Sequence, residues 1–168
     1  MSVIFASYLS SPIGEIEITA NENAIESIGF LEHPKSNSTC QENEISKIAQ
    51  QQLLEYIENK RTTFDLPLAF LGSDFQNKVW QQLQTIPFGK TMSYLQFAID
   101  LGNEKCIRAA ASANGKNPFA IVVPCHRVIG KNGALTGYAG GLWRKQWLLE
   151  HEGAFSKQNI LFAESNTR

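Results

Sequence analysis

The sequence has no long apolar run, no close pair of cysteines and no repeated or low-complexity segment. Without a run of about 20 apolar residues, a transmembrane helix is not expected. The opening residues, MSVIFASY, lack the basic lead and the apolar core that are typical of a signal peptide. We therefore expect a cytoplasmic protein that does not associate with membranes.

Cysteine is scarce as well. Cys40, Cys106 and Cys125 are widely spaced, and a reducing compartment favours free thiols over disulfides. None of the cysteines has the Cys or His spacing that is typical of a zinc site, and His126 follows Cys125 too closely to suggest one. We expect no structural metal and no cofactor.

Hydrophobic residues make up 43% of the chain and charged residues 18%, which is ordinary for a folded domain. The net charge of −1 conceals an uneven distribution. Residues 1–73 carry four Lys/Arg and ten Asp/Glu, whereas residues 74–153 carry nine and five. A basic second half is compatible with binding to a polyanion, although random variation of a small protein's surface gives the same pattern.

The first part of the chain has the alternation and turn signals of β-strands. We expect strands over Ile4–Leu9, Glu15–Thr19 and Ala24–Phe30, joined as an antiparallel meander. Apolar residues at helical spacing then predict an amphipathic helix over Glu42–Asn59, which should cover one face of the sheet. Arg61–Leu66 is compatible with a last short strand.

From about residue 74 onward the pattern becomes helical. Asp74 can cap a helix that runs to about Gln84. Its expected inward side chains are Phe75, Val79, Trp80 and Leu83. Ser93 can cap a second helix, Gly102 and Asn103 turn the chain, and a third helix follows over Glu104–Ala113. A helix, a short turn containing glycine and a second helix are typical of a helix-turn-helix motif, though two packed helices also occur in many α-rich domains.

The most informative segment surrounds Cys125. Ile121–Val123 is an apolar run that we expect to be buried, and Pro124 ends it because proline cannot donate a backbone hydrogen bond. A cysteine reacts as its thiolate, which needs a nearby base or positive charge. His126 and Arg127 are adjacent and could supply either, but these residues alone favour a buried cysteine followed by a structural histidine.

Longer stretches of sequence carry a resemblance to a known family. They are FQNKVWQQLQTIPFGKTMSYLQFA at Phe75–Ala98, NGKNP at Asn114–Pro118, PCHRVIG at Pro124–Gly130, GYAGGL at Gly137–Leu142 and LLEHEG at Leu148–Gly153. With these motifs, in this order, the chain resembles the methylated-DNA–protein-cysteine methyltransferases, also called O6-alkylguanine-DNA alkyltransferases. The resemblance is strong over residues 74–155, whereas the N-terminal half fits the family only in length and element order.

The resemblance implies an α+β fold with two domains. Residues 1–72 would form a ribonuclease-H-like domain with an antiparallel sheet and a helix. Residues 73–168 would form a mainly helical domain that carries a winged helix-turn-helix, binds DNA and accepts the alkyl group.

The resemblance also implies a chemistry. Cys125 would accept the alkyl group of O6-alkylguanine, and Tyr94 would donate a proton to the leaving base. Glu152 would orient His126, which would activate Cys125 through a water molecule, and Asn117 would hold the surrounding turn. The product is a stable thioether, so each molecule would repair one lesion. Whether O4-alkylthymine is a second substrate stays open.

The implied partner is double-stranded DNA containing an alkylated guanine, bound by a protein monomer. The damaged base must be rotated out of the duplex. Arg108 would fill the vacated space, and the small Ala109 would let its helix approach the minor groove. Lys105 and Arg127, with Lys116 and Lys131, are candidates for contacts to phosphates, although each of them taken alone is more often an ordinary solvated charge. The base pocket would be lined by Tyr138, Ala139, Gly140 and Val128.

Some residues depart from the family pattern or are assigned no function. Ala139 replaces a serine that many relatives carry, which changes a side chain but keeps the backbone amide. Cys106 is expected to be a small buried residue, and Trp143 and Trp147 are expected to lie in the core.

Three other functions are compatible with parts of the sequence. A lesion-binding protein without transfer activity would lack the acceptor cysteine, which is present here. A cysteine hydrolase would need an oxyanion site, for which the sequence gives no sign. A helix-turn-helix regulator would need a further regulatory domain. We therefore favour the alkyltransferase.

Overall fold

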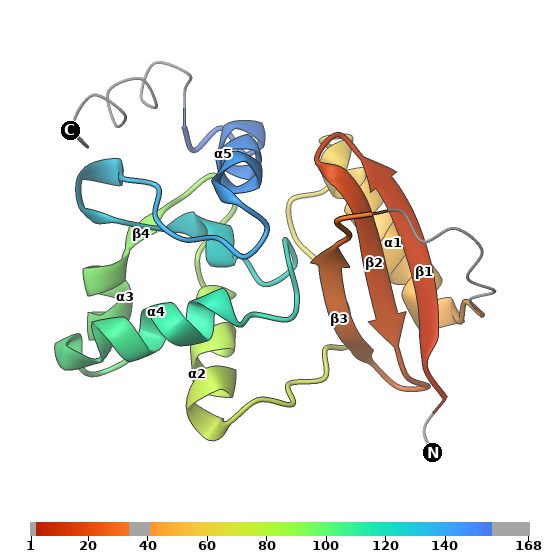
Figure 1. The fold of residues 1–168 in the computed structure, drawn as a ribbon, viewed down its shortest axis with the longest axis horizontal. Helices are drawn as coiled ribbons and strands as arrows, with labels where there is room; N and C mark the ends of the chain where they lie inside the picture. The colour runs from red at the N-terminus through yellow and green to blue at the C-terminus, as the bar shows by residue number, and fades with distance from the viewer. Residues whose placement is uncertain (1–2, 34–40, 156–168) are drawn as a thin grey trace. The chain divides into compact units, whose positions relative to one another are not determined.

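The structure, a computed structural model, describes residues 3–33 and 41–155 (Figure 1). The chain forms two compact units. Unit 1 consists of residues 1–71 and Pro118–Val122, and unit 2 consists of Gly72–Asn117 and Val123–Arg168. The predicted domains 1–72 and 73–168 differ from these units at Gly72 and in the segment 118–122. Cys40 lies outside the described residues.

Unit 1 is built on a three-stranded antiparallel sheet. Its strands are β1 (Phe5–Ser11), β2 (Gly14–Ala20) and β3 (Ile25–Phe30), in the order β1-β2-β3. Ile16 and Ile18, two residues apart on β2, are completely buried, as the alternation of the sequence predicts. The predicted meander is confirmed.

Helix α1 (Glu44–Ile57) covers one face of this sheet and contacts all three strands (Figure 1). Its N-terminus is fixed by a capping box between Asn43 and Ser46. Ala49, Leu53 and Tyr56 form its buried stripe. The predicted helix is confirmed, although Ile48, one of its apolar residues, is 44% exposed.

The short strand expected at Arg61–Leu66 is absent from the part of the chain that the structure describes. Instead, Leu68 makes a single parallel bridge to Ile25 at the outer edge of β3. Pro67 accepts a backbone hydrogen bond from Ile25, and Ala69 donates one back. These two hydrogen bonds form an isolated bridge between Ile25 and Leu68 and do not extend into a strand.

The segment Pro118–Val122 also pairs with β3. The Ile28 N–H donates to Pro118 O at 2.8 Å, and the Ala120 N–H donates to Ile28 O at 3.0 Å. Between them, Phe119 is completely buried and meets Phe70 edge to face, with ring centroids 5.6 Å apart. A short segment that immediately precedes Cys125 in the sequence thus completes the edge of the sheet in unit 1.

Helix α2 (Asp74–Leu83) opens unit 2. Its N-cap is Ser73 rather than the predicted Asp74, because the Ser73 hydroxyl accepts from the Gln76 N–H while the Gln76 side chain accepts from the Ser73 N–H. Val79, Trp80 and Leu83 are buried as predicted. Phe75 is wrongly predicted to point inward, since it lies in the first turn and is 37% exposed.

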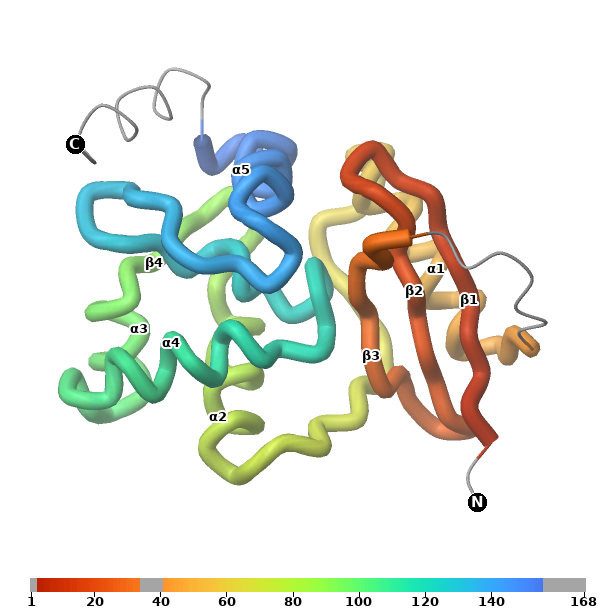
Figure 2. The backbone as a smooth tube through the Cα atoms, viewed as in Figure 1, coloured from red at the N-terminus to blue at the C-terminus, as the bar shows by residue number. Residues whose placement is uncertain are grey.

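The predicted helix-turn-helix follows. Ser93 caps α3 (Tyr94–Asp100), Gly102 turns the chain at a φ of 101°, and a 3-10 turn (Glu104–Cys106) leads into α4 (Ile107–Gly115). Helices α3 and α4 pack against each other. Figure 2 shows the path of the chain from α2 through this pair.

The rest of unit 2 contains a short strand that pairs next to the start of α3, and a final helix. Strand β5 (Val128–Ile129) pairs in parallel with β4 (Met92–Ser93), the residues just before α3. A loop then leads to α5 (Leu142–His151), after which the described chain ends at residue 155. The α+β fold class is confirmed. The expectation that Trp143 lies in the core is wrong, because this residue is 55% exposed at the first turn of α5.

None of the helices in residues 3–33 and 41–155 is long and apolar enough to span a bilayer.

Candidate active site

Cys125, His126 and Arg127 form a single 3-10 turn directly before β5. Pro124 precedes them with φ −82° and ψ 62°, and the Cys125 N–H donates to Val123 O at 2.8 Å. This is an inverse γ-turn, which reverses the chain sharply at the proline. All three residues of the 3-10 turn are buried, and His126 is completely so.

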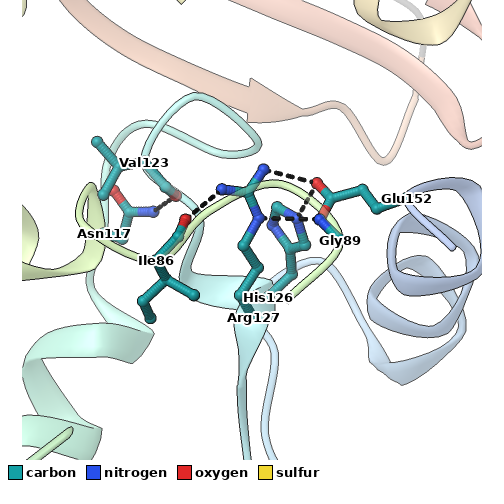
Figure 3. A network of polar contacts seen from close by, with 7 residues as sticks. All are labelled: Ile86, Gly89, Asn117, Val123, His126, Arg127 and Glu152. Atoms are coloured by element: carbon teal, nitrogen blue, oxygen red, sulfur yellow. Dashed lines mark hydrogen bonds and ion pairs between the residues drawn. The ribbon is translucent and has the colours of Figure 1, made fainter. Parts of the chain in front are cut away.

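The carboxylate of Glu152, at the end of α5, binds both basic residues of this turn (Figure 3). Its Oε1 lies 2.8 Å from His126 Nε2. Arg127 donates to it twice, from Nε to Oε2 and from Nη2 to Oε1, each at 2.9 Å. The Gly89 N–H adds a longer contact of 3.4 Å to Oε2. Such a fork of two parallel bonds is the strongest geometry for an arginine–carboxylate pair.

The environment keeps Glu152 ionised and His126 neutral. Burial alone would raise the pKa of Glu152, but hydrogen bonds and charges of His126 and Arg127 hold it well below its usual range. Burial lowers the pKa of His126, despite the opposing influence of Glu152. A neutral imidazole beside a carboxylate carries its proton on the nitrogen that faces the carboxylate, here Nε2.

The other imidazole nitrogen is free to act as a base. His126 Nδ1 is buried and has no hydrogen-bond partner in the described part of the chain. With the proton on Nε2, Nδ1 carries a lone pair. A buried acceptor without a partner is costly, which makes the position suitable for a water molecule or a transferred proton.

Arg127 does not face DNA as the sequence suggested. Besides its two bonds to Glu152, its Nη1 donates to Ile86 O at 2.6 Å, and the residue is 6% exposed. The expectation that Arg127 contacts phosphates is wrong, because its guanidinium points into unit 2 and is engaged there. Its charge instead fixes the carboxylate that holds His126.

Two asparagines hold the backbone around Cys125. Asn117 Nδ2 donates to Val123 O at 2.8 Å, the carbonyl that also closes the γ-turn. Asn114 Nδ2 donates to Cys125 O at 3.4 Å, and its Oδ1 is buried with no partner among the described residues. The resemblance gave a role to Asn117, whereas Asn114 appeared only as the first residue of the NGKNP motif.

The thiol of the site is buried and the tyrosine beside it is half-buried. Burial raises the pKa of Cys125, while Asn117, Lys145 and backbone amides oppose that rise. Burial also raises the pKa of Tyr94, at the start of α3, against hydrogen bonds from Thr136 and Asn114. Tyr94 therefore keeps its proton at neutral pH and can donate it.

Lys145 is a residue that the sequence analysis missed. Its side chain is completely buried in α5, and its Nζ donates to Val128 O at 2.7 Å, to Thr136 O at 3.0 Å and to Gly137 O at 3.5 Å. The signal was available, because Lys145 lies three and four residues before the apolar Leu148 and Leu149 and so shares their face of the helix.

The other expected residues are distributed over three segments of unit 2. Lys105, Arg108 and Ala109 are exposed on the 3-10 turn and the first turn of α4. Cys106 between them is half-buried rather than buried as expected. The loop before α5 carries Tyr138, Ala139 and Gly140; the Tyr138 hydroxyl is buried without a partner in the described residues, while Ala139 is exposed. Val128 is completely buried.

No group of three or more His, Cys, Asp or Glu side chains that could hold a metal ion is present within residues 3–33 and 41–155.

Both parts of the chain match domains of one known protein family. Residues 4–70 match the ribonuclease-like domain of 6-O-methylguanine DNA methyltransferase, and residues 74–154 match the DNA-binding domain of that family. A methylated-DNA–protein-cysteine methyltransferase of Methanosarcina acetivorans is 41% identical over 155 residues, which cover 90% of this chain and 99% of the relative.

Solved structures agree in fold. The crystal structure of the O6-methylguanine methyltransferase of Mycobacterium tuberculosis has a TM-score of 0.80 at 38% identity, covering 95% of this chain and 99% of the other. A structure of Mycobacterium tuberculosis OGT in complex with DNA also has a TM-score of 0.80, at 39% identity, with coverage of 93% and 97%.

Proposed function

The chain belongs to the 6-O-methylguanine DNA methyltransferase family, and from this membership we propose that Cys125 is the residue that accepts the alkyl group. The protein binds DNA and repairs it by transferring an alkyl group to a cysteine. The observation that carries our assignment is the buried chain of contacts from Glu152 to His126, whose free Nδ1 belongs to the residue next to Cys125.

Activation begins with a neutral thiol and a neutral imidazole. We propose that the Cys125 proton passes to His126 Nδ1, through a water molecule. His126 then becomes an imidazolium that keeps its Nε2–H bond to the Glu152 carboxylate, and the thiolate is left beside the substrate. The fork of Arg127 on Glu152 keeps the carboxylate ionised and in place throughout.

The transfer is an in-line displacement. The Cys125 sulfur forms a bond to the alkyl carbon as the bond from that carbon to guanine O6 breaks, and the electron pair stays with the base. Tyr94 donates a proton or a hydrogen bond to the departing guanine, which lowers the barrier to its release. His126 then gives up the thiol proton, which restores the proton that Tyr94 donated, so that in total one proton has moved from Cys125 to guanine. The products are unmodified guanine and a thioether on Cys125.

The thioether explains why the reaction is stoichiometric. Water does not cleave a carbon–sulfur bond of this kind under the conditions of the site, and none of the proposed groups regenerates the thiol. Asn117 keeps Cys125 in position by holding Val123 O. Each protein molecule therefore repairs one lesion.

The proposed substrate is an alkylated guanine in double-stranded DNA, bound by a monomer of this protein in the cytoplasm. The base must leave the stack to reach a buried cysteine. Arg108, exposed on α4, would occupy the vacated space beside the small Ala109, while Lys105 would contact a phosphate. Tyr138, Ala139, Gly140 and Val128 would surround the rotated base. Residues 73–168 would carry all of these groups, and residues 1–72 would form the ribonuclease-like domain.

The test is the intact mass of the protein after incubation with duplex DNA that contains O6-methylguanine. We expect a gain of one methyl group per molecule, located on Cys125 by peptide mapping and absent from Cys125→Ser. If the wild-type protein binds the DNA but its mass stays unchanged, the transfer assignment fails and lesion binding alone remains. The same assay with O4-methylthymine decides whether that base is a second substrate.

A further inference from the structure

Lys145 is a buried cation whose charge no carboxylate balances in the described part of the chain. Its Nζ is surrounded by three backbone carbonyl oxygens, of Val128, Thr136 and Gly137. Carbonyl groups satisfy the three N–H donors of an ammonium, but they carry no net charge. Burial of an unpaired charge costs several kcal/mol, so such a lysine is unusual unless another charge faces it.

The groups around Lys145 include one that can become an anion. The ring centroid of Tyr94 lies 5.9 Å from Nζ, and Tyr94 keeps its proton. Lys145 and His126 repel each other when both are charged. Cys125, in contrast, begins the turn that Lys145 is bound to, because Lys145 Nζ donates to Val128 O and the Val128 N–H donates to Cys125 O. In this arrangement a thiolate on Cys125 raises the pKa of Lys145, and Lys145 in turn lowers the pKa of Cys125.

Helix α5 places this lysine in a fixed relation to the other charged group of the site. Lys145 and Glu152 are seven residues apart, about two helical turns, so they lie on the same face of the helix. Glu152 is already bound by His126 and Arg127 and is not the partner of Lys145. The helix thus presents one anion to His126 and Arg127 and one cation to the segment that follows them.

We propose that Lys145 is a positioning residue whose ammonium group is the counter-charge of the Cys125 thiolate. The proposal rests on Cys125 being the alkyl acceptor. When the thiol proton moves to His126, a negative charge appears on sulfur in a buried site. Lys145, held by Val128 O and by the loop that carries Tyr138, offsets that charge without moving.

Two further facts fit this role. Burial lowers the pKa of Lys145 to about 8, so the group is still mostly protonated at neutral pH. Its three acceptors come from both sides of the proposed base pocket, from β5 and from residues 136–137, which prevents the ammonium from turning toward solvent.

The first experiment measures how the reaction of Cys125 with iodoacetamide depends on pH. This reagent needs the thiolate but no DNA. The variants are Lys145→Met, which removes the charge, and Lys145→Arg, which keeps it; Lys47→Met, an exposed lysine of α1, is the matched control. Circular dichroism melting establishes that each variant is folded.

We expect the midpoint of the pH profile to move upward by about one unit in Lys145→Met, so that the rate below the midpoint falls about tenfold and recovers at high pH. Lys145→Arg should restore most of the lost rate, and Lys47→Met should match the wild type. A Lys145→Met profile with a lower plateau but an unchanged midpoint would overturn the proposal, because it would mean that Lys145 only holds the loop.

The second experiment uses the unaltered protein and so does not depend on how a variant folds. NMR of lysine labelled with ¹³C at Cε reports the pKa of Lys145 before and after Cys125 is alkylated. A thioether carries no charge, so the pKa of Lys145 should fall on alkylation; an unchanged pKa would contradict the proposal.

Iodoacetamide and methylated DNA are used in parallel in that experiment. If the DNA fails to alkylate the protein, the proposed function fails. The reagent still caps Cys125 in that case, so the role of Lys145 is tested independently.

Discussion

His126 and Glu152 make a contact of 2.8 Å between Nε2 and Oε1, and both side chains are completely buried. The contact orients the imidazole and assigns its proton to Nε2, since the carboxylate can only accept. Nδ1 is thereby left as a base with no partner in the described residues. Removal of a proton from a buried thiol needs a base with a fixed orientation. If the imidazole could rotate, the protonated nitrogen could face the thiol instead of the nitrogen with the lone pair.

Replacing Glu152 by Gln should slow alkyl transfer strongly. The amide can still accept a hydrogen bond from Nε2, but it has no charge to stabilise the imidazolium. We expect the single-turnover rate on duplex DNA with O6-methylguanine to fall by about 10²-fold or more. Glu150→Gln, on the same helix and half-buried, is the control and should react at the wild-type rate. Equal rates for Glu152→Gln and the wild type would exclude the proposed stabilisation of a His126 imidazolium by the charge of Glu152.

Glu152→Gln should also change how the free energy of unfolding depends on pH. The folded-state pKa of Glu152 is depressed, so its contribution is fully present above its unfolded value near 4.5 and is lost as the pH falls toward the folded value. At pH 7, Glu152→Gln leaves Arg127 buried without a counter-charge, which should cost about 3 to 5 kcal/mol of unfolding free energy.

Urea unfolding between pH 3 and pH 7 checks this prediction. The difference in unfolding free energy between the wild type and Glu152→Gln should narrow below about pH 4.5, because Glu152 takes up a proton in the unfolded wild-type chain while the folded carboxylate stays ionised. Two curves that stay parallel over the whole range would show that the carboxylate is not coupled to folding.

Arg127 and Lys105 should affect DNA binding differently. Lys105 is exposed, so Lys105→Met should reduce the slope of log affinity against log salt concentration by about one unit. Arg127 is buried on Glu152, so Arg127→Met should lower stability instead and leave the salt slope of the folded protein unchanged. Fluorescence anisotropy titrations at several salt concentrations give both slopes. A reduced slope for Arg127→Met would restore it as a phosphate contact.

Two tryptophans should respond differently to the same substitution. Trp80 is buried in α2, and its Nε1–H donates to Ala113 O on α4 at 2.9 Å. Trp80→Phe leaves that carbonyl without its donor and opens a small cavity, so we expect a loss of about 1 to 3 kcal/mol. Trp143→Phe, at an exposed site, should stay within about 0.5 kcal/mol of the wild type. Thermal melts of both variants decide whether Trp143 lies outside the core.

Local patterns in the sequence predicted most of the fold. The alternation in residues 15–19 and the helical spacing after Glu42 arise from burial of one face, which is visible in adjacent residues. Cap and turn residues such as Ser93 and Gly102 were also predictable, because they act on the backbone of adjacent residues. Ser73 was missed because both it and Asp74 are good caps, and only the reciprocal bond with Gln76 distinguishes them.

The site was less predictable, because its contacts join residues that are far apart in the sequence. The motif identified Cys125, His126 and Glu152, but nothing local indicates that Arg127 turns inward to meet a carboxylate 25 residues later. Lys145 was missed although it shares a helix face with Leu148 and Leu149, because lysines usually face water. Its buried position depends on three carbonyl groups from two other segments, which only the folded chain brings together.

The pairing of β3 with residues 118–120 has a consequence for the order in which the protein is made. β3 ends at Phe30, whereas Ala120, which closes the bridge to Ile28, is synthesised 90 residues later. Until then the outer edge of β3 has unpaired backbone groups on the nascent chain, and such edges readily pair with other chains. The helix-turn-helix must therefore be translated before the three-stranded sheet is complete. Cys125 is translated immediately after the few residues that pair with β3.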